Sequence, residues 1–187
     1  MTMPHEDARI AILIANGFNE PQITAVQRML TQDKRPHDII APEQGLVNSW
    51  RDNNWGHHFP VDQQIGTAMG SDYEYLILAG GTAGVEKLKT NPHTRRIINH
   101  FLEAKKPVAA IGEGVKLLAL SPKSAGLSVA APESCKEELK ASNIELLDAP
   151  LHQDETVLTS TGENIEAWTE RLTNFFQRAE IQDQQAA

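Results

Sequence analysis

Residues 107–118 have the pattern of a nucleophile elbow that carries no nucleophile. They read PVAAIGEGVKLL, an apolar strand that runs into a tight turn at residues 112–114 and then into the start of a helix. Enzymes of the α/β class use such a strand-to-helix corner to expose a Ser or Cys for covalent catalysis. Gly112 stands at this corner and has no side chain that could attack a substrate. We therefore expect the elbow to be retained without its covalent chemistry, and we assign no catalytic residue.

Two interpretations of the glycine turn remain open. Its backbone N–H groups could bind an anionic ligand, or the turn could be an ordinary tight connection from strand to helix. Glu113 argues against a bound anionic ligand, because its own carboxylate at the helix N-terminus would compete with that ligand. Gly80-Gly81 follows another apolar strand and forms either half of an oxyanion hole or a simple turn. The candidate ligand-binding residues of this cleft are Gly80, Gly81, Gly112, Glu113, Gln22 and Glu20.

The other reactive side chains have weaker patterns. Cys135, the only cysteine, lies in a predicted helix at 132–142 among acidic neighbours, which raise a thiol pKa, so we do not expect a reactive thiol. A single cysteine also excludes an internal disulfide and a cysteine-based zinc site. His57 and His58 have Asp62 nearby, but adjacent residues of an extended segment point to opposite faces. We predict a polar loop or interface there, with no metal and no cofactor.

An aromatic group is predicted in an excursion at residues 45–65, which reads as two β segments, 45–50 and 56–65, around a polar turn. Trp50, Trp55 and Phe59 are its aromatic residues. They would form a subunit contact if exposed, or fold down over the sheet if buried. The first alternative predicts a homo-oligomer, most simply a dimer, that associates through this excursion or through helix faces beside the elbow.

The elements that would position these residues alternate between strand and helix. Near-continuous apolar runs, rich in β-branched residues, predict parallel strands that are covered on both faces. The predicted strands lie at 9–15, 38–41, 75–79, 108–111, 144–147 and 156–159, and the helices at 20–34, 92–104, 132–142 and 164–179. This order predicts an α/β fold, a doubly wound, mainly parallel sheet sandwiched by helices, of the flavodoxin-like kind.

Composition limits the function classes. The chain has 187 residues, with 25 acidic against 17 basic side chains and a formal charge of -8. We expect one domain at 1–180, a polar frayed tail at 181–187, and no nucleic-acid partner. No apolar run reaches the roughly 18 residues of a membrane span, so we expect a soluble, cytoplasmic protein with no membrane partner.

The chain resembles the DJ-1/PfpI (ThiJ) superfamily from residue 9 to residue 176. The resemblance rests on the order of elements, on Gly80-Gly81 after an apolar strand, on the K-K-P that ends a helix, and on the elbow VAAIGEG. This superfamily is related in fold to class I glutamine amidotransferases. The stretches AGGTAGVEKL and KKPVAAIGEGVKLL are similar to the DJ-1-like C-terminal domain of large-subunit catalases. No haem-binding segment precedes them, so the resemblance is to that domain standing alone.

The resemblance implies a site from which this sequence departs. Active members, among them proteases and glyoxalases, place a Cys at the elbow, often a His after it, and a Glu that hydrogen-bonds the thiol. At the matching positions this chain has Gly112, Glu113 and Gln22, with Glu20 close to the third. The resemblance thus favours a non-catalytic, stress-related accessory, binding or oligomer-forming protein with a possible small-molecule ligand in the cleft. The alternatives are a hydrolase or amidotransferase-like enzyme with a non-cysteine site, and a partner subunit of a catalase-like protein.

Overall fold

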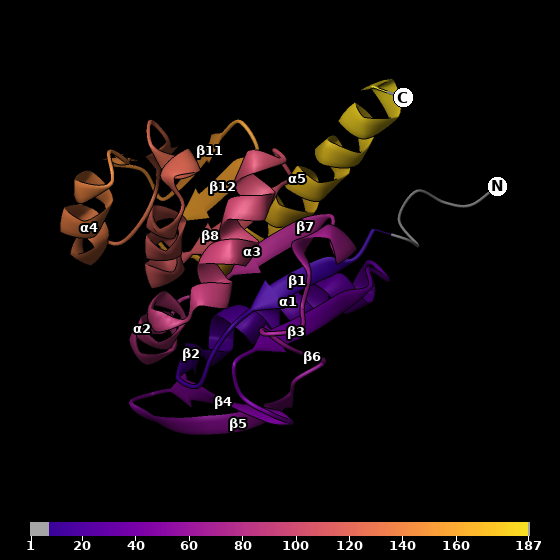
Figure 1. Ribbon diagram of the computed structural model, residues 1–187, viewed down its shortest axis with the longest axis vertical. Helices are drawn as coiled ribbons and strands as arrows, with labels where there is room; N and C mark the ends of the chain where they lie inside the picture. The colour runs from indigo at the N-terminus through magenta and orange to yellow at the C-terminus, as the bar shows by residue number, and fades with distance from the viewer. Residues whose placement is uncertain (1–7, 187) are drawn as a thin grey trace.

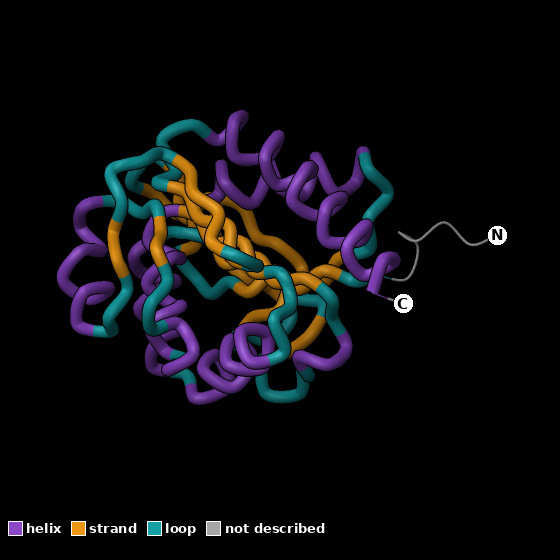
Figure 2. Tube along the Cα trace, turned by 90° about the horizontal axis from the view of Figure 1, so that it is seen from above, coloured by secondary structure: helices purple, strands orange, loops and turns teal. Residues whose placement is uncertain are grey.

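A large, mainly parallel sheet lies between two layers of helices in the computed structural model, which describes residues 8–186 (Figure 1, Figure 2). Its strands in chain order are β1 (Ile10–Leu13), β3 (His37–Ala41), β6 (Gln63–Gln64), β7 (Tyr75–Leu78), β8 (Val108–Ile111), β11 (Leu151–Asp154) and β12 (Val157–Ser160). They are arranged in the order β11-β12-β8-β7-β1-β3-β6. The antiparallel pair is β11 with β12, and the other neighbours are parallel. The predicted α/β class and sheet type are confirmed.

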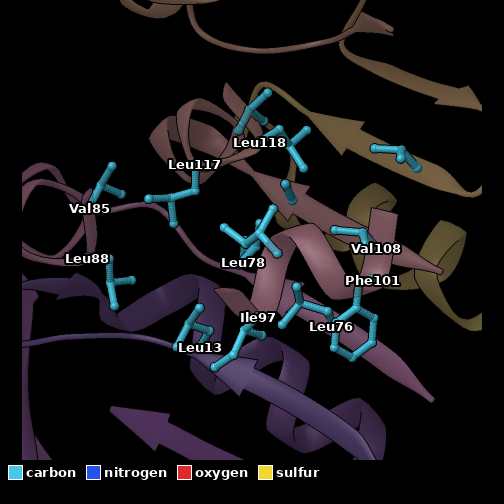
Figure 3. Close-up of a cluster of buried hydrophobic side chains, with 14 of the residues drawn as sticks. Leu13, Leu76, Leu78, Val85, Leu88, Ile97, Phe101, Val108, Leu117 and Leu118 are labelled. Atoms are coloured by element: carbon cyan, nitrogen blue, oxygen red, sulfur yellow. The ribbon is translucent and has the colours of Figure 1, made fainter. Parts of the chain in front are cut away.

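The three central strands, β1, β7 and β8, are adjacent and parallel as predicted, and every one of their residues is buried. Alternate side chains of these strands point to opposite faces. Figure 3 shows one face, where Leu76 and Val108 pack beside Ile97 and Phe101. The opposite face includes Ile12 and residues of two further helices. Both faces are covered, which explains why these strands read as continuous apolar runs.

The α-helices are α1 (Glu20–Gln32), α2 (Thr82–Thr90), α3 (Pro92–Glu103), α4 (Lys136–Ala141) and α5 (Ile165–Ala186). Local chemistry explains where α1 and α3 begin. The side chain of Asn19 accepts a hydrogen bond from the backbone N–H of Gln22, and Asn91 does the same for His93. Both helices also carry a proline in the first turn, where a missing N–H is tolerated.

Helix α2 is absent from the sequence-based prediction because its residues TAGVEKLKT follow two glycines and contain a third. Glycine is a poor helix former, but Gly84 is needed for packing. A Cβ at Gly84 would lie 2.9 Å from the carbonyl oxygen of Ala15, closer than real Cβ atoms approach. The helix therefore lies against the loop after β1 at a distance that only glycine permits.

The remaining differences concern short elements. The helix predicted at 132–142 is a 3-10 turn, η4 (Glu133–Cys135), that continues into α4. The strand predicted at 144–147 is β10 (Glu145–Leu146), which pairs with β9 (Ser128–Val129) outside the large sheet. Neither β9 nor β11 was predicted, because neither has the apolar run of a strand buried on both faces. Two further 3-10 turns are η1 (Gly70–Asp72) and η3 (Pro122–Ser124).

The excursion at residues 45–65 contains the predicted hairpin. Its strands are β4 (Leu46–Arg51) and β5 (Asn54–Pro60), and the turn residues Asp52 and Asn53 have the positive φ angles of a tight hairpin turn. A short strand, β2 (Phe18–Asn19), extends this pair into a three-stranded sheet. The predicted segment 56–65 is divided, because β6 leaves the hairpin and joins the large sheet.

The C-terminal helix continues to Ala186, so the predicted helix end near residue 179 is wrong. The reason is an interaction that no local pattern reveals. The carboxylate of Glu180 is 7% exposed and lies 2.5 Å from the guanidinium of Arg35, which is 4% exposed. The hydroxyl of Tyr75 donates to the same carboxylate at 3.3 Å. This buried ion pair fastens the last turns of α5 to the loop after α1.

We expect Glu180→Ala to lower the free energy of unfolding by about 3 kcal/mol, because it leaves the Arg35 guanidinium buried without a counter-charge. Urea unfolding followed by circular dichroism measures the change. Glu170→Ala, an exposed position on the same helix, is the matched control and should change stability by less than about 0.5 kcal/mol. Equal losses in the two variants would contradict a stabilising role for the pair.

Candidate functional site

The elbow lies at the C-terminal edge of the sheet, where parallel strands of this class commonly present ligand sites. Strand β8 ends at Ile111, and Gly112 begins a 3-10 helix, η2 (Gly112–Leu120), where an α-helical start was predicted at 115–118. Gly112 has a φ of +60°, the left-handed conformation in which glycine is unstrained. Gly114 is also required, because its Cβ would lie 2.6 Å from the carbonyl oxygen of Ala79.

The side chain of Gln22 fills the space in front of the elbow. Its amide oxygen accepts a hydrogen bond of 2.7 Å from the backbone N–H of Gly80, and the residue is 4% exposed. A Cβ at Gly112 would lie 3.1 Å from the amide nitrogen of Gln22, and a Cβ at Gly162 would lie at the same distance. The amide therefore occupies the position that an elbow nucleophile would face.

Glu113 reaches back to the same edge. Its carboxylate accepts a hydrogen bond of 3.2 Å from the backbone N–H of Gly81. A Cβ at Gly80 would lie 2.7 Å from the same Glu113 oxygen and 3.0 Å from the amide oxygen of Gln22. The N–H groups of Gly80 and Gly81, the possible oxyanion donors, are thus both bound by side chains of this chain.

Glu20 is the predicted site residue that the structure directs elsewhere. Its carboxylate, 4% exposed, accepts hydrogen bonds from the hydroxyl of Ser49 and from the backbone and ring nitrogens of His57, at 2.9 and 3.0 Å. Arg51 adds an ion pair at 3.4 Å. The hydroxyl and backbone hydrogen bonds hold the pKa of this carboxyl at about 2, below its usual 4.5. Glu20 therefore joins the start of α1 to the hairpin rather than to the elbow.

The structure brings together five of the predicted residues and adds one. Gly162, which follows β12, has a φ of +86°, and its Cβ would lie 3.7 Å from the Cα of Gly112. Sequence reasoning missed it, although a glycine two residues after a strand was the available signal. The residues that meet at the elbow are Gln22, Gly80, Gly81, Gly112, Glu113 and Gly162.

Cys135 is fully buried at the end of η4, whereas the elbow corner itself carries Gly112. Burial raises the pKa of its thiol, which opposes ionisation. His57 contacts Glu20, while His58 lies opposite Asn48 in the hairpin. Among residues 8–186, no group of three His, Cys, Asp or Glu side chains is arranged to hold a metal ion.

The aromatic residues of the hairpin divide between the two predicted alternatives. Phe59 folds down and packs edge-on against Phe18, with ring centroids 5.1 Å apart. Trp50 and Trp55 form an edge-on pair at 5.3 Å and remain 38% and 58% exposed. The outer face of the hairpin therefore presents an aromatic surface.

Residues 8–174 match the model of the DJ-1/PfpI family, and the chain belongs to that family. It is similar to "Putative cysteine protease YraA" of Bacillus subtilis, with 22% identity over 89% of this chain and 96% of that protein. A second relative is "Protein DJ-1 homolog D" of Arabidopsis thaliana, 36% identical over 34% of this chain. That match covers only 16% of the length of the plant protein.

A solved structure from Anabaena variabilis shares the fold. It is described as a two-domain protein containing DJ-1/ThiJ/PfpI-like and ferritin-like domains. The TM-score is 0.82 at 19% identity, and the alignment covers 92% of this chain and 48% of that one. Likeness at this identity concerns the fold alone.

No helix within residues 8–186 is both long and apolar enough to cross a bilayer.

The low pKa of Glu20 predicts a pH-dependent contribution to stability. The carboxyl binds its proton more weakly in the folded chain, at about 2, than at the ordinary 4.5. Its contribution should therefore be complete above about pH 4.5 and be lost as the pH falls towards about 2. We expect Glu20→Gln to be less stable than wild type near neutral pH, and the difference to shrink on acidification.

Unfolding in urea at about pH 6 and about pH 3 measures this difference. Glu166→Gln is the matched control, because Glu166 is likewise in the first turn of a helix but is exposed. The control should show only the small effect of a helix-terminal charge. A Glu20→Gln deficit that stays constant between the two pH values would contradict the assigned hydrogen bonds.

Proposed function

We propose that this protein is a non-catalytic, cytoplasmic member of the DJ-1/PfpI family that acts as a stress-related accessory or binding protein and forms homo-oligomers. The observation that carries the proposal is the filled elbow. Gly112 offers no attacking atom, and the buried amide of Gln22 takes the adjacent space and the N–H of Gly80. A covalent mechanism needs a nucleophile and free oxyanion donors at that corner. Position 112 carries no nucleophile, and the N–H groups of Gly80 and Gly81 are already bound by side chains.

Electrostatics support the same proposal. A catalytic thiol ionises when positive charge or a helix N-terminus stabilises the thiolate. Here the neighbours of the elbow corner are a neutral amide, Gln22, and the carboxyl group of Glu113. The negative charge of Glu113 opposes a thiolate rather than favouring one.

Two alternatives define what would overturn the proposal. An enzyme with a non-cysteine site would use Glu113 and a bound water, and the name of the Bacillus relative keeps hydrolysis among the reactions to assay. In the second alternative the chain would still be an accessory protein, but it would associate with a catalase-like protein instead of with a second copy of itself. The first is tested by turnover and the second by the composition of the assembly.

We expect the wild-type protein to hydrolyse esters and to convert methylglyoxal no faster than buffer. Gly112→Cys in a Cys135→Ser background should remain inactive, because its thiol lies beside Gln22 and Glu113. Its pKa should stay at or above the ordinary value of about 8.5. Thiolate absorbance against pH measures ionisation, and Cys135→Ser alone is the control. Turnover by the wild type, or an acidic thiol at position 112, would contradict the non-catalytic proposal.

We propose that the outer face of the hairpin binds a second copy of this chain. Trp50, Trp55 and Leu46 are 38%, 58% and 54% exposed there. The only Lys, Arg, Asp or Glu residues in 46–60 are Arg51 and Asp52, so this surface is neutral in a chain of charge -8. Two like-charged copies repel least when they meet through a neutral apolar surface.

We expect sedimentation equilibrium to give a dimer for the wild type and a 20.6 kDa monomer for Trp50→Ser/Trp55→Ser. Ile181→Ser removes another exposed apolar side chain, on α5, and should leave the dimer intact. A monomeric wild type, or a double variant that still dimerises, would overturn the assignment of this surface. A catalase-like partner would instead appear as a mixed assembly in pull-down experiments with such a protein.

A further inference from the structure

The amide of Gln22 is held at the elbow as a bound ligand would be. It comes from the first turn of α1, whereas the atoms around it follow β7, β8 and β12. The N–H of Gly80 is a donor, so the atom facing it at 2.7 Å is the carbonyl oxygen of the amide. Gly112 and Gly162 face the amide nitrogen with no side chains of their own. Three glycines thus leave room for one planar carboxamide.

The site favours a neutral group over an anion because of Glu113. Its carboxylate oxygen and the amide oxygen of Gln22 lie 2.7 and 3.0 Å from the position that a Cβ of Gly80 would take. A carboxylate in place of the amide would put two negative charges at this edge, and like charges disfavour ionisation. A carboxamide offers the same acceptor oxygen without the charge, together with an N–H₂ group that is compatible with a nearby carboxylate.

A cavity lies beside the segment that carries Gly162. The cavity of about 490 Å³ is lined by Thr161 and Glu163, the residues on either side of Gly162. The glycine between them faces the amide nitrogen of Gln22.

We propose that the elbow is a binding site for a small neutral carboxamide and that Gln22 fills it in cis. The inference deepens the non-catalytic function, on which it rests, by naming the chemistry that the cleft recognises: one acceptor oxygen on the N–H of Gly80 and no negative charge. A ligand of this class binds when Gln22 leaves the site, and in the native chain Gln22 competes with it.

The test removes the internal ligand and supplies its equivalent. Gln22→Ala deletes the carboxamide and leaves the N–H of Gly80 unpaired, so the melting temperature should fall. Propionamide, which carries the lost carboxamide with one carbon more than the deleted group, should raise the melting temperature of this variant with a saturating dose dependence and restore about half of the loss or more. Propionate, of the same shape but charged, should not. The amide resonance of Gly80 should return towards its wild-type shift with propionamide.

Two variants make the result specific. Gln27→Ala makes the same change on the same helix, away from the elbow, and propionamide should leave its melting temperature unchanged. Gln22→Met keeps the side-chain volume without the amide, so it should be destabilised but should not respond to propionamide. Should Gln22→Ala fail to fold, Gln22→Ser opens the same space with a smaller change and takes its place.

The proposal is overturned if propionamide stabilises Gln22→Ala no more than Gln27→Ala, or if propionate works equally well. Neither outcome bears on catalysis, which the turnover assays of the wild type decide separately. Conversely, an active wild-type enzyme would refute the non-catalytic function while leaving the amide-binding result to be judged on its own.

Discussion

Two backbone N–H groups at the C-terminal edge of this sheet, those of Gly80 and Gly81, need hydrogen-bond acceptors. The N–H groups of Gly80 and Gly81 leave β7 where neither continues a strand ladder, and a buried N–H without an acceptor is destabilising by about 1 to 3 kcal/mol. Gln22 and Glu113 supply the two acceptors. One comes from α1 and the other from the turn after β8, so the hydrogen bonds also hold three segments together. Both donors are thus bound by side chains of the chain itself.

Gln22 and Glu113 both depart from the residues that the family resemblance implies, and the need for two acceptors relates these departures to each other. The resemblance implies a Glu at the position of Gln22 and, often, a His at the position of Glu113. With Glu113 in place, a second carboxylate at position 22 would face a like charge near Gly80, and one of the two would have to bind a proton. The neutral amide avoids that conflict and keeps the acceptor oxygen. Gly112, Gln22 and Glu113 are therefore physically consistent with one another as a set.

Elements with a local residue pattern could be predicted from the sequence. Features that depend on contacts between residues far apart in the chain could not. Strands such as Ile10–Leu13 are apolar on both faces, so their burial and parallel pairing could be predicted from composition alone. The extent of α5 could not be, because its last turns are polar and are ordered by the pair between Glu180 and Arg35. The elbow residues could be listed, but not the direction of their side chains. Glu20 and Gln22 are two residues apart, yet one binds the hairpin and the other the elbow.

The elbow also persists for a reason unrelated to chemistry. A nucleophile at such a corner must adopt the left-handed conformation, which costs a non-glycine residue about 1 to 3 kcal/mol. Gly112 adopts a φ of +60° without this strain. Gly114 allows η2 to approach the carbonyl oxygen of Ala79 more closely than any Cβ would permit. With glycine at both positions, the backbone path that joins β8 to η2 is unstrained and closely packed.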